Sequence, residues 1–268
     1  MIVFVGDSYC SEYHVDPRVA PVRMYQNNLG GSDYQRSYRS WIDVVRDMSG
    51  TRVDVHGYAG QSWWHSWSNF DRAWSHKLQQ VQAVIFCHSN PERLNAVLDE
   101  PDTFAFPWDP KNKKLLADDE VKVHSPVQNA INVYYKYLFD PGFHDFAQNY
   151  YAEMLKEKLA HVKTIHFCCF PNTKGMDRLP GMVYTTPLLW LAIGGIGGSR
   201  QQVDSLFSSR PGPDVVCHMT QPVNQCLAEL VICSLNDYTP GQYEIDIGQF
   251  DLPNPNYLNW PDGIYWNK

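Results

Sequence analysis

Short runs of uninterrupted apolar residues alternate with helix-like segments over the first 90 residues, and this alternation strongly constrains the fold. The runs are IVFV at 2–5 and AVIFC at 83–87, with the alternating stretch TRVDVHG at 51–57 between them. Uninterrupted apolar strands are typical of parallel sheets that helices cover on both faces. The pattern therefore predicts an α/β fold, a three-layer α/β/α sandwich with a mostly parallel sheet.

Segments with helical spacing of apolar residues separate the predicted strands. One covers 37–50 and stops at Gly50, and the next covers 61–81. Residues 128–161 predict two helices broken at Asp-Pro-Gly, and 220–235 predict a clear amphipathic helix with a proline near its start. A further buried strand, VKTIHFCCF, is expected between these last two regions.

The chain is expected to form one domain over residues 1–268. Residues 98–127 carry Pro101, Pro107, Pro110 and a charged stretch, so they predict an insertion or lid rather than a second domain. Residues 238–268 carry four prolines among aromatic residues, which predicts an irregular strap over the surface.

Charge and hydropathy exclude several classes of partner. The net charge is −7 and no block of Lys or Arg occurs, which disfavours nucleic acid. No run of about 18 apolar residues is present, so no membrane span is expected. Met1 leads directly into the first strand without a signal-like segment, which predicts a cytoplasmic location.

The seven cysteines mostly lie in apolar runs, and their number is odd. This usage favours reduced, buried thiols over a disulfide framework. No Cys-x-x-Cys pair and no Cys/His spacing typical of zinc occurs, so no metal site is expected.

Residues capable of chemistry fall where the predicted strands end. Ligands of open parallel sheets bind beyond the carboxyl ends of the strands. The residues at these places are Ser8 after the first strand, Gly57 and Gly60 after the second, Ser89 and Asn90 after the third, and His218 shortly before the last helix.

Four motifs in this order resemble the blocks of the SGNH (GDSL-type) hydrolase superfamily. They are GDSY at 6–9, GYAGQS at 57–62, FCHSN at 86–90 and HMTQPVNQCLAELV at 218–231. The third block departs from the usual Gly-Gly-Asn-Asp of that family. The resemblance implies a flavodoxin-like topology and hydrolysis of an ester through an acyl-serine. The substrate would be a small-molecule or carbohydrate ester, such as an O-acetylated carbohydrate, and no cofactor would be needed.

The resemblance also implies the role of each site residue. Ser8 would attack as the nucleophile, with His218 first as its base and then as acid. The backbone N–H groups of Ser8 and Gly60 and the side-chain amide of Asn90 would form the oxyanion hole. A glycine at position 60 would let the backbone approach the substrate closely.

The acid of the triad is the main departure from the family pattern. The family places an aspartate three residues before the histidine, and that position is Val215 here. Asp214 lies four residues before His218 and is the candidate third member. The alternative is a Ser–His dyad whose ring is oriented by a backbone carbonyl or water.

Asp7, His88 and Trp63 are candidate substrate-binding residues because they lie within or beside these blocks. Each has a structural alternative. Asp7 would brace the turn, and Trp63 would pack in the core. Ser8 and His218 could cap helices instead, and Asn90 could close a turn before a proline.

Two other functions stay open from the sequence. The first is a catalytically silent module that binds a carbohydrate or another ligand stacked on aromatic rings. The second is a flavin or nucleotide binder of the same topology, although GGIGGS at 194–199 lacks the Gly-x-Gly-x-x-Gly register. The sequence does not predict an oligomeric state.

Overall fold

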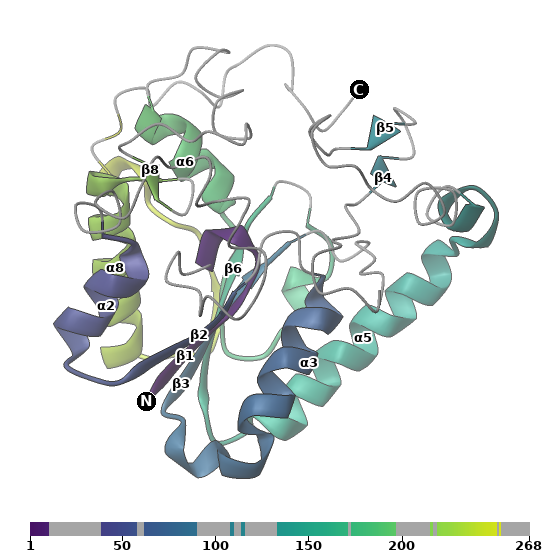
Figure 1. The fold of residues 1–268 in the computed structure, drawn as a ribbon, viewed down its shortest axis with the longest axis horizontal. Coiled ribbons are helices and arrows are strands. Elements are labelled where there is room, and N and C mark those ends of the chain that lie inside the picture. The colour runs from purple at the N-terminus through teal and green to yellow at the C-terminus, as the bar shows by residue number, and fades with distance from the viewer. Residues whose placement is uncertain are drawn as a thin grey trace, which may run out of the picture.

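A six-stranded parallel sheet forms the centre of the molecule (Figure 1). The computed structural model describes residues 1–10, 39–57, 62–89, 108–109, 114–115, 133–170, 173–196, 215–216, 219–250 and 252. The strands of the sheet are β1 (Ile2–Gly6), β2 (Val53–Gly57), β3 (Ala83–His88), β6 (Lys163–Cys168), β7 (Met182–Tyr184) and β10 (Gly241–Tyr243). They lie in the order β2-β1-β3-β6-β7-β10, and every ladder between them is parallel. The prediction of an α/β fold with a mostly parallel sheet is confirmed.

Strand β1 lies where the strand order reverses. It pairs with β2 on one side, with Ile2 opposite Val53, and with β3 on the other, with Ile2 opposite Ala83. The sheet therefore grows in two directions from β1. In open α/β sheets such a reversal leaves a crevice beyond the carboxyl ends of the two strands, and this crevice is the usual ligand site. The residues that follow β1 lie at this edge.

Five longer helices accompany the sheet within the described residues, and short helical turns connect some of the elements. The helices are α2 (Trp41–Ser49), α3 (Trp63–Trp74), α5 (Pro141–Lys158), α6 (Leu188–Ile196) and α8 (Gln221–Asn236). The short elements are η1 (Ser8–Cys10), η3 (Ser75–Gln80), η4 (Tyr134–Leu138), η5 (Met176–Arg178) and η6 (Ile247–Gln249). Two separate two-stranded antiparallel pairs join β4 (Trp108–Asp109) to β5 (Lys114–Leu115), and β8 (Val215–Val216) to β9 (Met219–Thr220).

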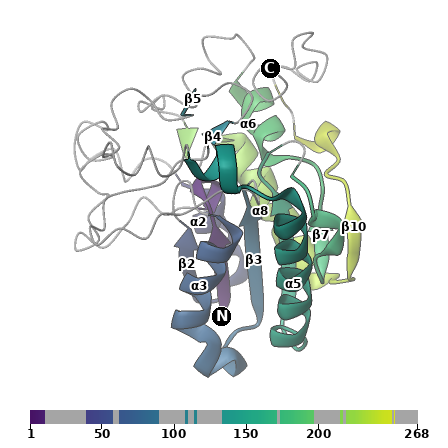
Figure 2. The same ribbon diagram turned by 90° about the vertical axis from the view of Figure 1, so that its right-hand side faces the viewer.

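The helices form a layer on each face of the sheet (Figures 1 and 2). Helices α2, α6 and α8 share one apolar core with Phe4 and Ile85, whereas α3 and α5 share a second core with Val3, Val5 and Val84. Neighbouring residues of a strand point to opposite faces, so both sets of side chains must be apolar. This double burial explains why the strands read as uninterrupted apolar runs.

Local sequence signals set the helix ends. The Ser40 hydroxyl accepts from the Asp43 N–H while the Asp43 carboxylate accepts from the Ser40 N–H, which forms a capping box at the start of α2. Gly50 ends the helix with a φ of 58°, a left-handed conformation that favours glycine. The expected break before α5 is also confirmed, because the Asp140 carboxylate caps that helix at Gly142 N.

Two strands of the six-stranded sheet were not expected from the sequence. Strands β7 and β10 are three residues long, too short to carry a periodic pattern, and β10 lies within the segment predicted to be an irregular strap. The rest of that strap beyond 252 lies outside the described residues. Of the expected insertion at 98–127, the structure describes only the β4–β5 pair. The prediction of a single domain stays a prediction.

None of the helices in the described part of the chain combines the length and the apolar character needed to cross a membrane.

Candidate active site

The turn that carries Ser8 follows directly from the central strand. Strand β1 ends at Gly6, Asp7 follows, and the 3-10 turn η1 begins at Ser8. The Tyr9 N–H donates to Oδ1 of Asp7 at 3.1 Å, and the Cys10 N–H donates to the Asp7 carbonyl at 3.1 Å. Asp7 thus closes the turn with both its side chain and its backbone, and this fixes the Ser8 backbone at the carboxyl end of β1.

Two glycines let this turn lie directly on the ends of the neighbouring strands. Gly6 and Gly57 are opposite each other in the β1–β2 ladder. A Cβ at Gly6 would lie 2.2 Å from the Cys87 carbonyl oxygen, and one at Gly57 would lie 2.2 Å from the Cys10 carbonyl oxygen. Real Cβ atoms do not approach backbone so closely, so only glycine allows this packing. The position of Gly57 at the end of the strand was expected from the sequence, whereas its close approach to Cys10 was not.

Asp7 is buried rather than open to a substrate. Its exposed fraction is 1%, its N–H donates to the Cys87 carbonyl at 3.3 Å, and the Cys169 thiol donates to its Oδ1 at 3.4 Å. These contacts tie the turn to both β3 and the residue that follows β6. They favour a role of Asp7 in stabilising the turn and disfavour a direct contact of its side chain with substrate.

Three buried thiols lie in or beside the turn. Cys10 belongs to η1, Cys87 to β3, and Cys169 follows β6. Burial raises the pKa of each of the three thiols well above its usual value. Thiolates are the reactive form of cysteine, so these side chains are poor nucleophiles at neutral pH. The expectation of buried, reduced cysteines is confirmed for these three and for Cys168, whereas Cys233 is exposed.

His88 is enclosed by aromatic rings at the end of β3. Its exposed fraction is 3%, and its ring packs on Trp63 with centroids 4.4 Å apart and on Phe86 with centroids 5.4 Å apart. Its Nε2 atom lies 2.8 Å from Nδ1 of His166. Burial lowers the pKa of His88 well below its usual value and lowers that of His166 to about 3, so both rings are neutral.

Trp63 begins α3 and is also buried, with 5% of its surface exposed. Its indole N–H donates to the Ser89 carbonyl at 2.7 Å. The indole therefore ties the start of α3 to the end of β3, just before Asn90. A substrate contact by Trp63 or His88 stays a prediction, and the contacts described above are structural.

The remaining predicted site residues lie outside the described residues. These are Gly60, Asn90, Asp214 and His218. Their flanking elements are described: β2 ends at Gly57, and β3 ends at His88. In the sequence, His218 falls between Val216, the last residue of β8, and Met219, the first residue of β9. These two strands pair antiparallel, and α8 begins at Gln221 directly after β9. The roles of these four residues stay predictions.

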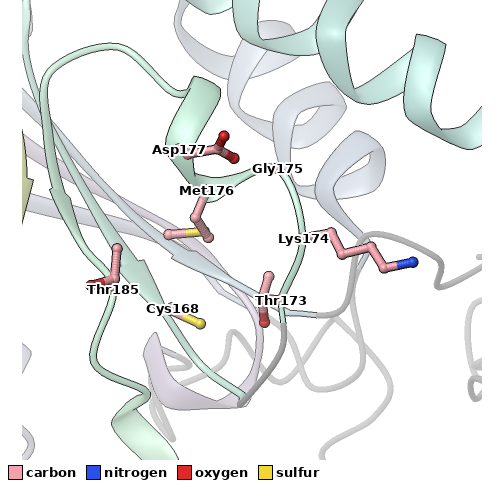
Figure 3. Close-up of a pocket in the computed structure, with 7 residues that line it drawn as sticks. All are labelled: Cys168, Thr173, Lys174, Gly175, Met176, Asp177 and Thr185. Carbon is pink, nitrogen blue, oxygen red and sulfur yellow. The ribbon is translucent and has the colours of Figure 1, made fainter.

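A cavity of about 260 Å³ lies at the carboxyl ends of β6 and β7 (Figure 3). It is lined by Cys168, Thr173, Lys174, Gly175, Met176, Asp177 and Thr185. The Lys174 side chain points away from the other lining side chains (Figure 3). The hydroxyls of Thr173 and Thr185 donate to backbone carbonyls. This cavity was not expected from the sequence, although Thr173 and Lys174 closely follow a predicted strand.

Within the described ranges, no three His, Cys, Asp or Glu side chains are grouped so that they could hold a metal ion.

The fold is that of an α/β protein in which a turn follows the central strand β1 at the reversal point of a parallel sheet, the place where such sheets usually bind their ligands. Comparisons with protein-family models, with curated proteins and with solved structures found no match to this chain.

Proposed function

We propose that the chain is a serine hydrolase of the SGNH type that cleaves an ester through an acyl-serine intermediate. An O-acetylated carbohydrate is one candidate substrate. The observation that carries the proposal is the position of Gly6-Asp7-Ser8 at the carboxyl end of the central strand, where the strand order reverses. This is the place where open α/β sheets hold their catalytic and ligand-binding groups.

The rigid attachment of the turn supports the same function. A nucleophile contributes most when it is held in a reactive geometry before the substrate arrives. The Asp7 hydrogen bonds and the close packing at Gly6 and Gly57 hold the Ser8 backbone against three strand ends.

The proposed chemistry divides among the predicted residues. His218 takes the Ser8 proton as the hydroxyl oxygen attacks the ester carbonyl, and it then gives that proton to the leaving alcohol. The negative charge of the tetrahedral intermediate is held by N–H donors from Ser8, Gly60 and Asn90. Water then releases the acyl group by the reverse sequence of proton transfers.

A fluorophosphonate probe tests the proposal, because it reacts covalently with activated serines. We expect the probe to label the peptide that contains Ser8, as located by mass spectrometry, and we expect turnover of p-nitrophenyl acetate. Ser8→Ala should abolish the labelling and lower turnover by about six orders of magnitude. Ser75→Ala, which removes an exposed serine at the end of α3, is the matched control and should keep both.

Labelling that persists in Ser8→Ala would remove Ser8 as the nucleophile. A wild-type protein that is folded, unlabelled and inactive would favour the catalytically silent binding module.

A further inference from the structure

The cavity at the carboxyl ends of β6 and β7 has an uncharged interior (Figure 3). Two of its described lining residues, Cys168 and Met176, are buried, and two more, Thr173 and Thr185, are half-buried. Burial raises the pKa of the Cys168 thiol, so this group is neutral at physiological pH. These four residues therefore line the cavity with a thiol, a thioether and two threonine side chains.

The charged lining residues lie at the rim of the cavity. Lys174 and Asp177 are exposed, and the Lys174 side chain points away from the other lining side chains (Figure 3). Their charges are opposite, so the rim as a whole favours neither anions nor cations. A buried ion needs a partner of opposite charge, and the described lining residues offer none in the interior. The charges therefore favour an uncharged ligand.

The polar side chains of the interior have already used their own hydrogens. The Thr173 hydroxyl and the Cys168 thiol both donate to the Phe170 carbonyl, at 2.7 and 2.9 Å. The Thr185 hydroxyl donates to the Tyr243 carbonyl at 3.2 Å. A hydroxyl has one hydrogen and two lone pairs, so each threonine oxygen can still accept a hydrogen bond. A ligand that pairs with these side chains must therefore be a donor.

The wall of the cavity is held in place by α5. A Cβ on Gly175 would lie 2.6 Å from Oε1 of Gln148, so the loop packs directly on that helix. Arg178, in η5, pairs with Asp145 of α5 at 2.9 Å. Oε1 of Gln148 is buried and accepts no hydrogen bond from the described residues, which adds an acceptor beside the wall. A cavity whose wall is already fixed binds a ligand without the cost of ordering a loop.

One sugar ring meets these conditions. The cavity measures about 260 Å³, below the roughly 300 to 1,000 Å³ of pockets for drug-sized ligands. It has room for about nine water molecules at about 30 Å³ each, which suits a single ring rather than an oligosaccharide. A sugar ring carries hydroxyl donors at its edge and C–H groups on its faces. The hydroxyls match the threonine oxygens, and a C–H face matches the Met176 side chain.

We infer that this cavity binds one sugar ring, whose hydroxyls donate to Thr173 and Thr185 while a C–H face packs on Met176. The inference stands apart from the proposed ester cleavage, because it concerns binding alone. The cavity lies at the same edge of the sheet as the Ser8 turn, and β6 is two strand spacings, about 10 Å, from β1. A carbohydrate ester cleaved at Ser8 would therefore have a neighbouring sugar unit within reach of the cavity.

Saturation-transfer difference NMR with the methyl glycosides of glucose, galactose, mannose and N-acetylglucosamine tests this inference. These probes carry no ester, so the result does not depend on turnover. At least one of them should bind with a dissociation constant of about 1 mM, as a few hydrogen bonds and a small apolar contact provide. Tetrahydropyran has the same ring without hydroxyls and should not bind detectably.

Variants of the two threonines locate the binding. Thr173→Val and Thr185→Val each remove an acceptor with little change of shape, and each should weaken binding by about three- to tenfold. Thr185→Ser keeps the hydroxyl and should keep most of the affinity. Thr239→Val is the matched control, because it removes an exposed hydroxyl that also donates to a backbone carbonyl, that of Asp237 at 3.3 Å, outside the cavity. Thermal unfolding shows that each variant is folded.

Each outcome has a defined meaning. A wild-type protein that binds none of the glycosides would overturn the inference. Equal binding of tetrahydropyran would do the same, because the hydroxyls would then not be recognised. Unchanged affinity in both valine variants would place the binding elsewhere and would also overturn it. Binding that depends on the two threonines, in a protein that the fluorophosphonate probe does not label, would support the sugar site while the proposed ester cleavage fails.

Discussion

Nε2 of His88 lies 2.8 Å from Nδ1 of His166, so the two imidazoles share one hydrogen bond inside the core. One ring belongs to β3 and the other to its neighbour β6, where His88 pairs with Cys168 and His166 with Phe86. Both rings are neutral because burial disfavours the imidazolium form. This relationship makes the core sensitive to acid.

The first prediction concerns that sensitivity. The pKa of His166 is about 3 in the folded protein and about 6.5 in the unfolded chain, so the unfolded chain binds the proton first as the pH falls. The contribution of His166 to the free energy of unfolding is therefore complete above about pH 6.5. As the pH falls from about 6.5 to about 3, this contribution decreases by about 1.4 kcal/mol for each pH unit. Urea unfolding at several pH values measures how steeply the free energy of unfolding changes with pH. This slope should be shallower in His166→Gln. The exposed His76→Gln should leave it unchanged.

The second prediction separates a bracing role of Asp7 from a substrate contact. Asp7→Ala removes the buried acceptor of the Tyr9 N–H and should lower the free energy of unfolding by about 1 to 3 kcal/mol. Asp7→Asn keeps an amide oxygen at that place and should lose less. Denaturant unfolding and steady-state kinetics measure the two roles. A higher KM with unchanged stability in both variants would assign Asp7 to substrate.

The third prediction concerns the close approach of the Ser8 turn to β2. Gly57→Ala places a Cβ against the Cys10 carbonyl, and the turn must move away. We expect a loss of about 1 to 3 kcal/mol in unfolding free energy, as for other overpacked sites, and a parallel loss of turnover. Gly142→Ala is the control, since its Cβ would meet only the Asp140 carboxylate at 3.2 Å. Unchanged turnover in a folded Gly57→Ala variant would contradict the link between this packing and the site.

The fourth prediction addresses the acid that would orient His218. Under the dyad hypothesis, Asp214→Asn should change turnover by less than about tenfold, compared with about four powers of ten when the acid of a true triad is neutralised. Steady-state hydrolysis of p-nitrophenyl acetate by the folded variant gives the answer. A loss of a thousandfold or more would make Asp214 the third member of a triad.

The fifth prediction concerns the thiols. Cys10, Cys87 and Cys169 are buried, and burial raises the pKa of each, whereas Cys233 is exposed. Iodoacetamide should therefore modify Cys233 in the native protein and reach the other three only in denaturant. Mass spectrometry of the alkylated peptides measures this order. Rapid native alkylation of Cys87 would show that the packing beneath the turn opens readily.

The main features of the sheet could be predicted because its longer strands are buried on both faces. IVFV in β1 and AVIFC in β3 are apolar throughout for that reason. Strand β7 could not be predicted, since its three residues are held by their pairing with β6 rather than by any pattern of their own.

The site could be predicted only where neighbours in sequence determine it. The position of Ser8 after a strand follows from the local sequence, and so does the end of α2 at Gly50. The burial of Asp7 depends on Cys169, which is 162 residues away in the chain. Likewise, the enclosure of His88 depends on His166, which reaches it only because β3 and β6 are adjacent. Such long-range contacts leave no local signal.

The central position of β1 has a consequence for how the chain folds. The ladders of β1 join Ile2 to Val53 and Ile2 to Ala83, so each must close a long loop before any pairing energy is gained. Proteins dominated by such non-local pairings fold slowly. During synthesis the first strand must wait for β2 and β3 to emerge, and its apolar residues stay available to chaperones until the third strand has been made.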